Sequence, residues 1–267
     1  MPPPTLVITQ PTPLMAIPLV QTAQVNGWQI IKTVGGRLPA EAMRGPVALF
    51  GNWQQACLIA QSNRLILLAP DAEWILRLPP EFLGRKINIL AWEQARGLSE
   101  PHYFKAVDWP EFAPQVYMNG QQLAEQVELP DESRIMVSPP VTYEYEFRCF
   151  VNQGSVTTLS PYRHRGESCQ QRGSWKAPEP MHDEATEFCE MLLADPRVEA
   201  PPALAVDVGL VAEVGWLVVA AHACWHADLY GCNSRGVLEA LLQSCRNHFN
   251  IAAEDERWGV HGVSLTA

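Results

Sequence analysis

The sequence predicts an α+β protein in which a smaller α/β domain precedes a larger domain of hairpins and helices. In residues 1–98, short apolar runs of strand length alternate with gaps of helix length, the pattern of a largely parallel sheet. Further along, two pairs of strand-like runs are joined by short turns that contain glycine, which is typical of an antiparallel sheet. We therefore expect an α/β domain at 1–98, a second domain at 99–250 and a tail at 251–267.

The amino-terminal domain is defined by its apolar runs. Strands are predicted at 6–8, 28–31, 47–51, 65–69 and 87–90, and helices at 53–61, 71–78 and 92–96. Pro79 and Pro80 stop the second of these helices, because proline has no backbone N–H to donate and disfavours helix at the residue before it. Strands that alternate with helices in this way indicate βαβ units.

The second domain has a different pattern. Single strands are predicted at 103–105, 115–117 and 134–138, hairpins at 143–151 with 155–160 and at 204–210 with 216–221, and helices at 121–127, 183–193 and 235–247. A polar loop occupies 162–176, and the segment after Phe249 is polar and expected to be loosely held.

Composition excludes several classes of function. The chain has 267 residues, 47% of them hydrophobic, and 19 basic against 29 acidic side chains give a formal charge of −10. Because no stripe of Lys and Arg is present, DNA and RNA are not expected as partners. No run reaches the about 18–20 apolar residues that span a bilayer, and the proline-rich start lacks the basic region of a secretory signal. Seven cysteines without regular spacing indicate reduced thiols, so the expected location is the cytoplasm.

The strand at 143–151 is the most informative segment. Read with a period of two, Glu144, Glu146, Arg148 and Phe150 share one face, while the opposite face is apolar. Two acids and an arginine on a strand that is otherwise apolar indicate a cleft for a polar, ionic ligand. A solvated outer face of an antiparallel sheet has the same alternation, so both interpretations stay open.

Two isolated charges and one loop are further candidates. Lys105 ends a short apolar strand and is placed to meet ligand phosphates, unless it is a surface lysine. Asp207 lies inside an apolar strand, where a carboxylate must be paired, hydrogen-bonded or bound to a metal. The loop 162–166 carries two arginines and a histidine, which suits an anionic substrate or a solvated loop.

A cluster of possible metal ligands follows the second hairpin. In an extended conformation His222, Cys224, His226 and Asp228 share one side, and Cys232 follows. These are zinc-type ligands, although their spacing matches no familiar zinc motif and alternating side chains of one strand reach a single ion poorly. A buried structural thiol is the commoner role for cysteines of this kind.

The ordered series of segments resembles the ATP-grasp superfamily, in particular a small bacterial and phage clade marked by one arginine and two lysines. The segments that carry the resemblance are 70–79, 102–105, 135–141, 145–151 with 160–162, 205–209 and 229–232. The resemblance implies two α+β subdomains that grip ATP between them, behind a smaller α/β domain. It also implies a ligase that activates a carboxylate as an acyl phosphate, which an amine or another nucleophile then attacks.

The resemblance assigns roles by position. Lys105 would touch the ATP phosphates, Ser138 and Val141 would border the adenine, and Arg148, with Glu146 beside it, would face the γ-phosphate or the acyl phosphate. The partners implied are a nucleotide and a small-molecule or peptide carboxylate. ATP and Mg²⁺ are the implied cofactors, with Asp207 and His222 as metal-side residues.

The sequence also departs from the superfamily pattern. A metal-binding aspartate is followed in many members by Glu-x-Asn, and from Asp207 these two places fall on Ala220 and His222. The second lysine of the clade falls near Pro110. Three hypotheses follow: a ligase with a modified metal site, a degenerate member that binds a nucleotide or a protein without catalysis, and a metal-binding protein that uses the cluster from His222 to Cys232.

Overall fold

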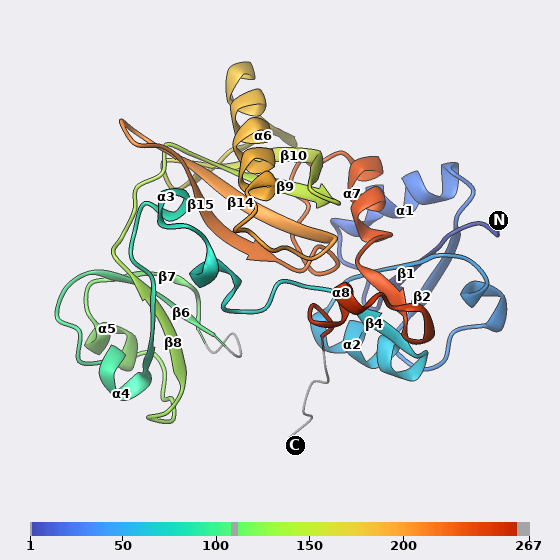
Figure 1. The fold of residues 1–267 in the computed structure, drawn as a ribbon, viewed down its shortest axis with the longest axis horizontal. Helices are drawn as coiled ribbons and strands as arrows, with labels where there is room; N and C mark the ends of the chain where they lie inside the picture. The colour runs from blue at the N-terminus through green and yellow to red at the C-terminus, as the bar shows by residue number, and fades with distance from the viewer. Residues whose placement is uncertain (1, 108–111, 261–267) are drawn as a thin grey trace.

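The computed structural model describes residues 2–107 and 112–260, which form three lobes, each centred on a sheet (Figure 1). The amino-terminal lobe lies at one end of the molecule and the lobe of β5 to β8 at the other (Figure 1). The five-stranded sheet of β9, β10, β11, β14 and β15 lies between and above them in this view. The predicted α+β class with an amino-terminal parallel α/β sheet is confirmed.

The amino-terminal lobe is built on a parallel sheet in the order β2-β1-β3. Its elements are β1 (Thr5–Thr9), α1 (Ala16–Val25), β2 (Gln29–Thr33), a 3₁₀ helix (Ala40–Met43), β3 (Val47–Phe50) and α2 (Trp53–Ser62). Strand β1 is buried along its whole length because it is the central strand and has apolar residues on both faces. Helix α2 begins where the Asn52 side chain accepts a hydrogen bond from the backbone N–H of Gln55.

The fourth predicted strand does not join this parallel sheet. Strand β4 (Leu65–Leu67) pairs antiparallel with β16 (Cys245–Asn247), which lies close to the end of the chain. The helix predicted at 235–247 therefore ends early, as α7 (Ser234–Leu241), because β4 needs a partner and Cys245 is buried in the core. Helical periodicity cannot reveal such a long-range pairing.

A four-stranded antiparallel sheet forms the second lobe, in the order β5-β8-β6-β7. Its elements are β5 (Asn88–Ala91), α4 (Trp92–Ala95), β6 (His102–Ala106), β7 (Gln115–Tyr117), α5 (Gly120–Ala124) and β8 (Arg134–Ser138). A separate core that includes Trp92, Phe104 and Ile135 holds the helices to the sheet. Because β5 pairs with β8, this lobe begins before residue 98, so its sheet extends across the domain boundary expected there.

The third lobe is an antiparallel sheet in the order β11-β10-β9-β14-β15. Its strands are β9 (Tyr145–Asn152), β10 (Ser155–His164), β11 (Glu167–Ser168), β14 (Ala203–Val211) and β15 (Gly215–His222). The β9–β10 turn has positive φ at both Gln153 and Gly154, the conformation that matches the twist of a two-residue hairpin. Both predicted hairpins are present.

Two helices cover this sheet. Helix α6 (Glu179–Ala194) packs on the face that carries Phe147, Cys149 and Val151, and it contributes Phe188 and Leu192 to that core. Phe150 points to the other face, where α7 packs against β9 and β10. Beyond α7, that second face carries polar side chains.

The remaining elements are short. They are a 3₁₀ helix (Trp74–Arg77), α3 (Pro80–Leu83), the two-stranded β12 (Gln170–Gln171) and β13 (Ser174–Trp175), a 3₁₀ helix (His248–Asn250) and α8 (Ala253–Glu256). The segment after residue 250 is packed against the protein as far as residue 260: Trp258 is buried, and Gly259 bridges to Leu68. The loose tail expected from residue 251 is therefore wrong over this stretch.

Candidate functional site

The charged face of β9 is buried, so the alternative of a solvated outer face is wrong. Glu146 is 7% exposed and Arg148 4% exposed, and Asp207 on β14 is also 4% exposed. Arg148 and Asp207 are direct cross-strand partners in the β9–β14 ladder, which places their side chains on the same face of the sheet. The two strongest charged candidates of the sequence are thus brought together at the centre of the sheet.

Arg148 and Asp207 form a bidentate ion pair. Arg148 Nε donates to Asp207 Oδ1 over 2.6 Å, and Arg148 Nη2 donates to Asp207 Oδ2 over 2.7 Å. Burial alone would raise the pKa of Asp207, but the charges of Arg148 and His222 hold it well below its usual range. Asp207 is therefore ionised throughout the physiological pH range.

The guanidinium of Arg148 is enclosed on its remaining sides. Its Nη1 donates to the backbone carbonyl of Asp228 over 3.2 Å, and its carbon lies 5.0 Å from the ring centroid of Tyr230 and 5.9 Å from that of Tyr162. The two tyrosine rings stack on each other with centroids 4.8 Å apart. Three of the five N–H donors of the guanidinium are used by these contacts and the ion pair.

His222, the last residue of β15, completes the set around Asp207. Its Nε2 lies 3.0 Å from Asp207 Oδ2, and because a carboxylate only accepts, the contact requires a proton on Nε2. Burial lowers the pKa of His222, against the opposing effect of the Asp207 charge. Its side chain is 34% exposed, the largest exposure among the groups that contact Asp207.

Glu146 is held by a tyrosine. The hydroxyl of Tyr162 donates to Glu146 Oε2 over 2.7 Å. Burial raises the pKa of Glu146, and the Tyr162 hydrogen bond and the charge of Arg163 oppose the rise. Tyr162 therefore contacts both Glu146 and the guanidinium of Arg148. The sequence predicted Tyr162 in a polar loop, whereas it lies in strand β10.

Glu146, Arg148 and Asp207 form a polar row on this face of the five-stranded sheet. The second lobe faces this polar row with one side of β6. Tyr103 and Lys105 share that side, opposite the buried Phe104. Burial lowers the pKa of Lys105 and the charge of Asp207 raises it, while burial raises the pKa of Tyr103 to about 12. Lys105 therefore lies within the electrostatic field of Asp207.

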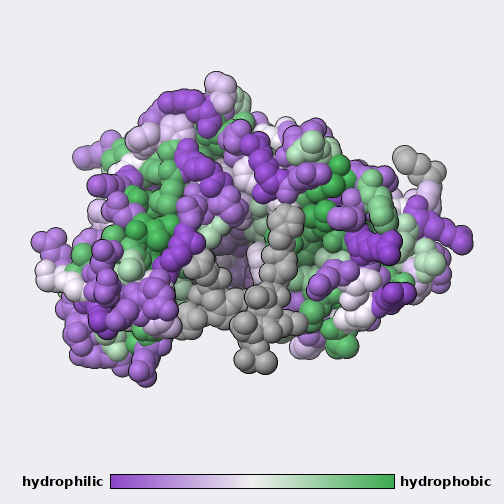
Figure 2. Space-filling model, turned by 60° about the horizontal axis from the view of Figure 1, so that its bottom comes forward, coloured by the Kyte–Doolittle hydropathy of each residue, from purple (hydrophilic) through white to green (hydrophobic). Residues whose placement is uncertain are grey.

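Arg85 lies between the lobes. It donates from Nη1 to the backbone carbonyl of Val218 over 2.9 Å and from Nη2 to that of Val219 over 3.2 Å, so it anchors the segment before β5 to strand β15. Figure 2 shows the molecular surface hollowed between the lobes on the face turned to the viewer.

The two predicted adenine-side residues lie at the junction of the lobes. Ser138 ends β8, is 4% exposed, and donates from its hydroxyl to the Pro139 carbonyl over 3.2 Å. Val141 is half-buried in the segment that connects β8 to β9. A connection between two sheets is the position expected for a hinge, and the contact of these residues with adenine stays a prediction.

The residues around Asp207 do not fit magnesium. Ala220 is the cross-strand partner of Asp207 on β15 and has no oxygen to offer, and both Asp207 oxygens are taken by Arg148. Within residues 2–107 and 112–260, no three His, Cys, Asp or Glu side chains lie grouped so as to hold a metal ion. Magnesium prefers several oxygen donors in octahedral geometry, and imidazole is a poor substitute.

The segment from His222 to Cys232 is not an extended run of ligands. Strand β15 ends at His222, Cys224 is fully buried, and His226 Nδ1 lies 2.8 Å from the Gly51 carbonyl oxygen. Cys232 is also buried, with its Sγ 3.7 Å from the carbonyl oxygen of Arg148. The prediction that these side chains share one side of an extended strand is wrong, because the chain turns after His222.

The remaining candidates are less central. Arg165 is exposed and pairs with Glu144 over 3.0 Å, so part of the cationic loop is a solvated surface. Pro110, the expected position of the second lysine, lies outside the described residues.

All seven cysteines are free thiols, and no helix of the described residues is long and apolar enough to cross a membrane.

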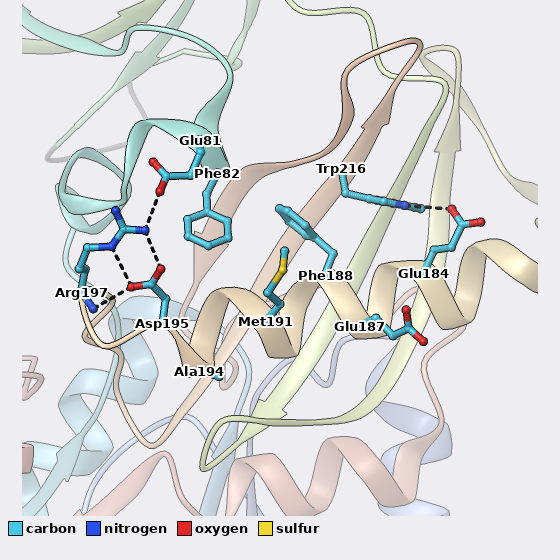
Figure 3. A pocket seen from close by; sticks show the side chains of 10 residues that line it. All are labelled: Glu81, Phe82, Glu184, Glu187, Phe188, Met191, Ala194, Asp195, Arg197 and Trp216. Carbon is cyan, nitrogen blue, oxygen red and sulfur yellow. Dashed lines mark hydrogen bonds and ion pairs between the residues drawn. The ribbon is translucent and has the colours of Figure 1, made fainter.

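A groove lies on the α6 face of the five-stranded sheet, the face opposite the polar row (Figure 3). Phe82, Phe188, Met191 and Trp216 form its apolar floor, and Trp216 Nε1 donates to Glu184 over 3.1 Å. Arg197 at its end pairs with both Glu81 and Asp195. The groove contains none of the predicted site residues.

Comparison with known families and structures agrees with this architecture. A family model described as an ATP-grasp domain, family 2 of the clade named for one arginine and two lysines, matches residues 82–240, more than half of the chain. The matched range begins in α3, before the second lobe, and ends in α7. No curated protein matches the sequence.

Solved structures match over most of the chain. The D-cycloserine synthetase DcsG is 14% identical with a TM-score of 0.58, and a RimK domain protein ATP-grasp from Sphaerobacter thermophilus is 16% identical with a TM-score of 0.56; each match covers 90% of this chain and 98% of the other. A D-alanine–D-alanine ligase from Bacillus anthracis, complexed with ATP, is 12% identical over 91% of this chain and 96% of its own, with a TM-score of 0.52. At these identities the likeness establishes the fold alone.

Proposed function

We propose that this chain, which belongs to family 2 of the arginine and two-lysine clade of ATP-grasp domains, is an ATP-dependent ligase that joins a carboxylate to an amine or another nucleophile. One observation carries the proposal. Lys105, Glu146, Arg148 and Asp207 come from three strands of two different sheets: the last three share one buried face, and the charge of Asp207 raises the pKa of Lys105 on the other sheet. Buried charges from separate elements that converge in a cleft are a hallmark of functional sites.

In this proposal ATP lies between the two lobes, with its adenine at the junction that contains Ser138 and Val141. Lys105 contacts the phosphates as a point charge. Arg148 lies on the opposite sheet, fixed by Asp207, and lends a positive field to the γ-phosphate or the acyl phosphate as negative charge develops there. Glu146, held by Tyr162, borders the same region.

The substrate that we propose is a small-molecule or peptide carboxylate, which the γ-phosphate activates as an acyl phosphate. The described residues do not supply the donors of a magnesium site, so the phosphate charge is met by side chains of the chain itself. We place the protein in the cytoplasm, where ATP is available and its seven thiols stay reduced.

A second function, nucleotide binding without catalysis, is favoured by the closed Arg148–Asp207 pair. Arg148 is only 4% exposed and already has partners for three of its five donors. An arginine held in this way contributes less to a transferring phosphoryl group than one that projects into the cleft. The two functions share the nucleotide site and differ only in turnover.

The test separates binding from turnover. Thermal stabilisation by ATP and ADP should appear in the wild type, because a ligand that binds only the native state raises the melting temperature by mass action. Incubation with ATP, a panel of amino acids and short peptides, and hydroxylamine should then yield ADP and a hydroxamate from the trapped acyl phosphate. Stabilisation without ADP or hydroxamate supports the binding function. Absence of any nucleotide effect at millimolar concentration would refute both.

A further inference from the structure

We propose that the cleft binds its nucleotide as the metal-free anion, and that Asp207 serves to hold Arg148 rather than to coordinate a divalent cation. The inference rests on the proposed function for the presence of a nucleotide. It goes beyond that function because it changes the chemical species that is bound. Three features of the structure carry it.

The first feature is that both oxygens of Asp207 are already occupied. Three donors point at this carboxylate: Arg148 Nε at 2.6 Å from Oδ1, and Arg148 Nη2 at 2.7 Å and His222 Nε2 at 3.0 Å from Oδ2. The Tyr162 hydroxyl also lies 3.5 Å from Oδ2, but its single proton is donated to Glu146. A cation that approached either oxygen would have to break the bidentate pair and leave the buried Arg148 uncompensated.

The second feature is that the carboxylate near Asp207 on the same face, Glu146, is already engaged, and that the cross-strand position offers no other. Ala220 occupies that position on β15, and Glu146 on β9 accepts a hydrogen bond from Tyr162. Burial also raises the pKa of Glu146, which weakens it as a ligand for a cation. With Arg148 in contact, a divalent cation at Asp207 would face a net local charge near zero rather than a cluster of acids.

The third feature is a cation on the facing lobe. No carboxylate in the described parts of the chain forms an ion pair with Lys105, although the pKa of its ammonium responds to the field of Asp207. Lys105 is buried enough to lose much of its hydration and has the charge that a phosphate needs. The site therefore offers the Lys105 ammonium in place of a metal ion.

The proposal has a directional consequence. When Mg²⁺ binds ATP, it cancels two negative charges, so the complex is attracted less strongly by the Lys105 ammonium than free ATP is. We expect Mg²⁺ to leave nucleotide affinity unchanged or to weaken it. In a site that coordinates the metal through several acids, Mg²⁺ would instead strengthen binding.

The experiment measures the Kd of ATP for the full-length wild-type chain by calorimetry, once with Mg²⁺ and once with EDTA, at matched ionic strength. We expect the Kd in EDTA to be equal to or lower than the Kd in Mg²⁺. A Kd at least about tenfold lower with Mg²⁺ overturns the inference and leaves the proposed function intact. Absence of binding in both buffers overturns the proposed function itself, together with this inference.

A pair of variants tests the reason for metal independence. Ala220→Glu supplies the missing carboxylate opposite Asp207, and Ala220→Gln has the same shape without the charge. We expect Mg²⁺ to raise the melting temperature of Ala220→Glu but not that of Ala220→Gln or the wild type. An equal response to Mg²⁺ in all three proteins contradicts the role assigned to Ala220, and a response in the wild type alone overturns the inference.

Discussion

Replacing Asp207 with asparagine is the most direct test of how the buried pair is built. Asparagine keeps the size of the side chain, and its oxygen still accepts from Arg148 Nε. Its amide NH₂, however, would face the donor Nη2 of Arg148, which lies 2.7 Å from Asp207 Oδ2 in the wild type. The substitution therefore leaves a buried guanidinium without its counter-charge.

The expected loss follows from the burial of both partners. Each side chain is only 5% exposed, so the pair is in the class for which removal of one partner costs about 3–5 kcal/mol. Asp71→Asn is the matched control. Asp71 and Arg77 are also joined by two hydrogen bonds, but their side chains are 51% and 49% exposed, so its loss should cost about 0–1 kcal/mol.

The assay is equilibrium urea unfolding at neutral pH, compared among the wild type, Asp207→Asn and Asp71→Asn. The double variant Arg148→Met with Asp207→Leu should recover most of the loss, because replacing both members of a buried pair with apolar residues removes the unpaired charge. If Asp207→Asn lowers the free energy of unfolding no more than Asp71→Asn does, the buried ion pair does not stabilise the sheet.

The same pair predicts a pH dependence with a definite sign. The folded-state pKa of Asp207 is depressed, so its contribution is fully present above the unfolded pKa of about 3.9 and is lost as the pH falls toward the folded value. The stability difference between wild type and Asp207→Asn should shrink below about pH 4, where the carboxylate becomes protonated. A difference that grows as the pH falls below about 4 would contradict this assignment.

Three further predictions concern the rest of the site. Lys105→Ala should abolish most of the nucleotide-induced rise in melting temperature while the exposed Lys86→Ala keeps it, and equal effects would remove Lys105 from the phosphate site. Tyr162→Phe removes the hydrogen bond that lowers the pKa of Glu146, so that pKa should rise further in a carbon NMR titration; an unchanged value would mean that Tyr162 does not stabilise the carboxylate. Gly209→Ala would place a Cβ 2.4 Å from the Tyr143 ring and should cost about 1–3 kcal/mol in urea unfolding, whereas Gly97→Ala, whose nearest contact is at 3.4 Å, should be close to neutral.

Much of the fold is readable from local sequence patterns. The period-two alternation of 143–151, the turn at Gln153 and Gly154 and the apolar runs around residues 7, 30 and 48 all specify local conformation, and the structure contains the corresponding strands. These predictions succeed because backbone conformation and facial amphipathicity are encoded by neighbouring residues.

Pairings between distant segments were not readable. The β4–β16 ladder joins residues near 66 and 246, and the helix predicted at 235–247 was too long for that reason. Tyr230, 82 positions further along the chain, lies against the guanidinium of Arg148. Its backbone has a positive φ of 47°, which no periodicity of the sequence predicts. Such contacts depend on how whole elements pack together.

The sequence by itself determined which residues carry charge and which face of β9 they share. It also supplied the order of motifs that resembles an ATP-grasp domain, and the family match agrees with that resemblance. Only the tertiary structure decided what those charges do to one another. Arg148 and Asp207 are 59 positions apart, and the ladder between β9 and β14 places them opposite each other, where burial makes a bidentate pair the stable arrangement. Because that pair uses both oxygens of Asp207, the carboxylate that the sequence offered to a metal ion is bound instead to an arginine.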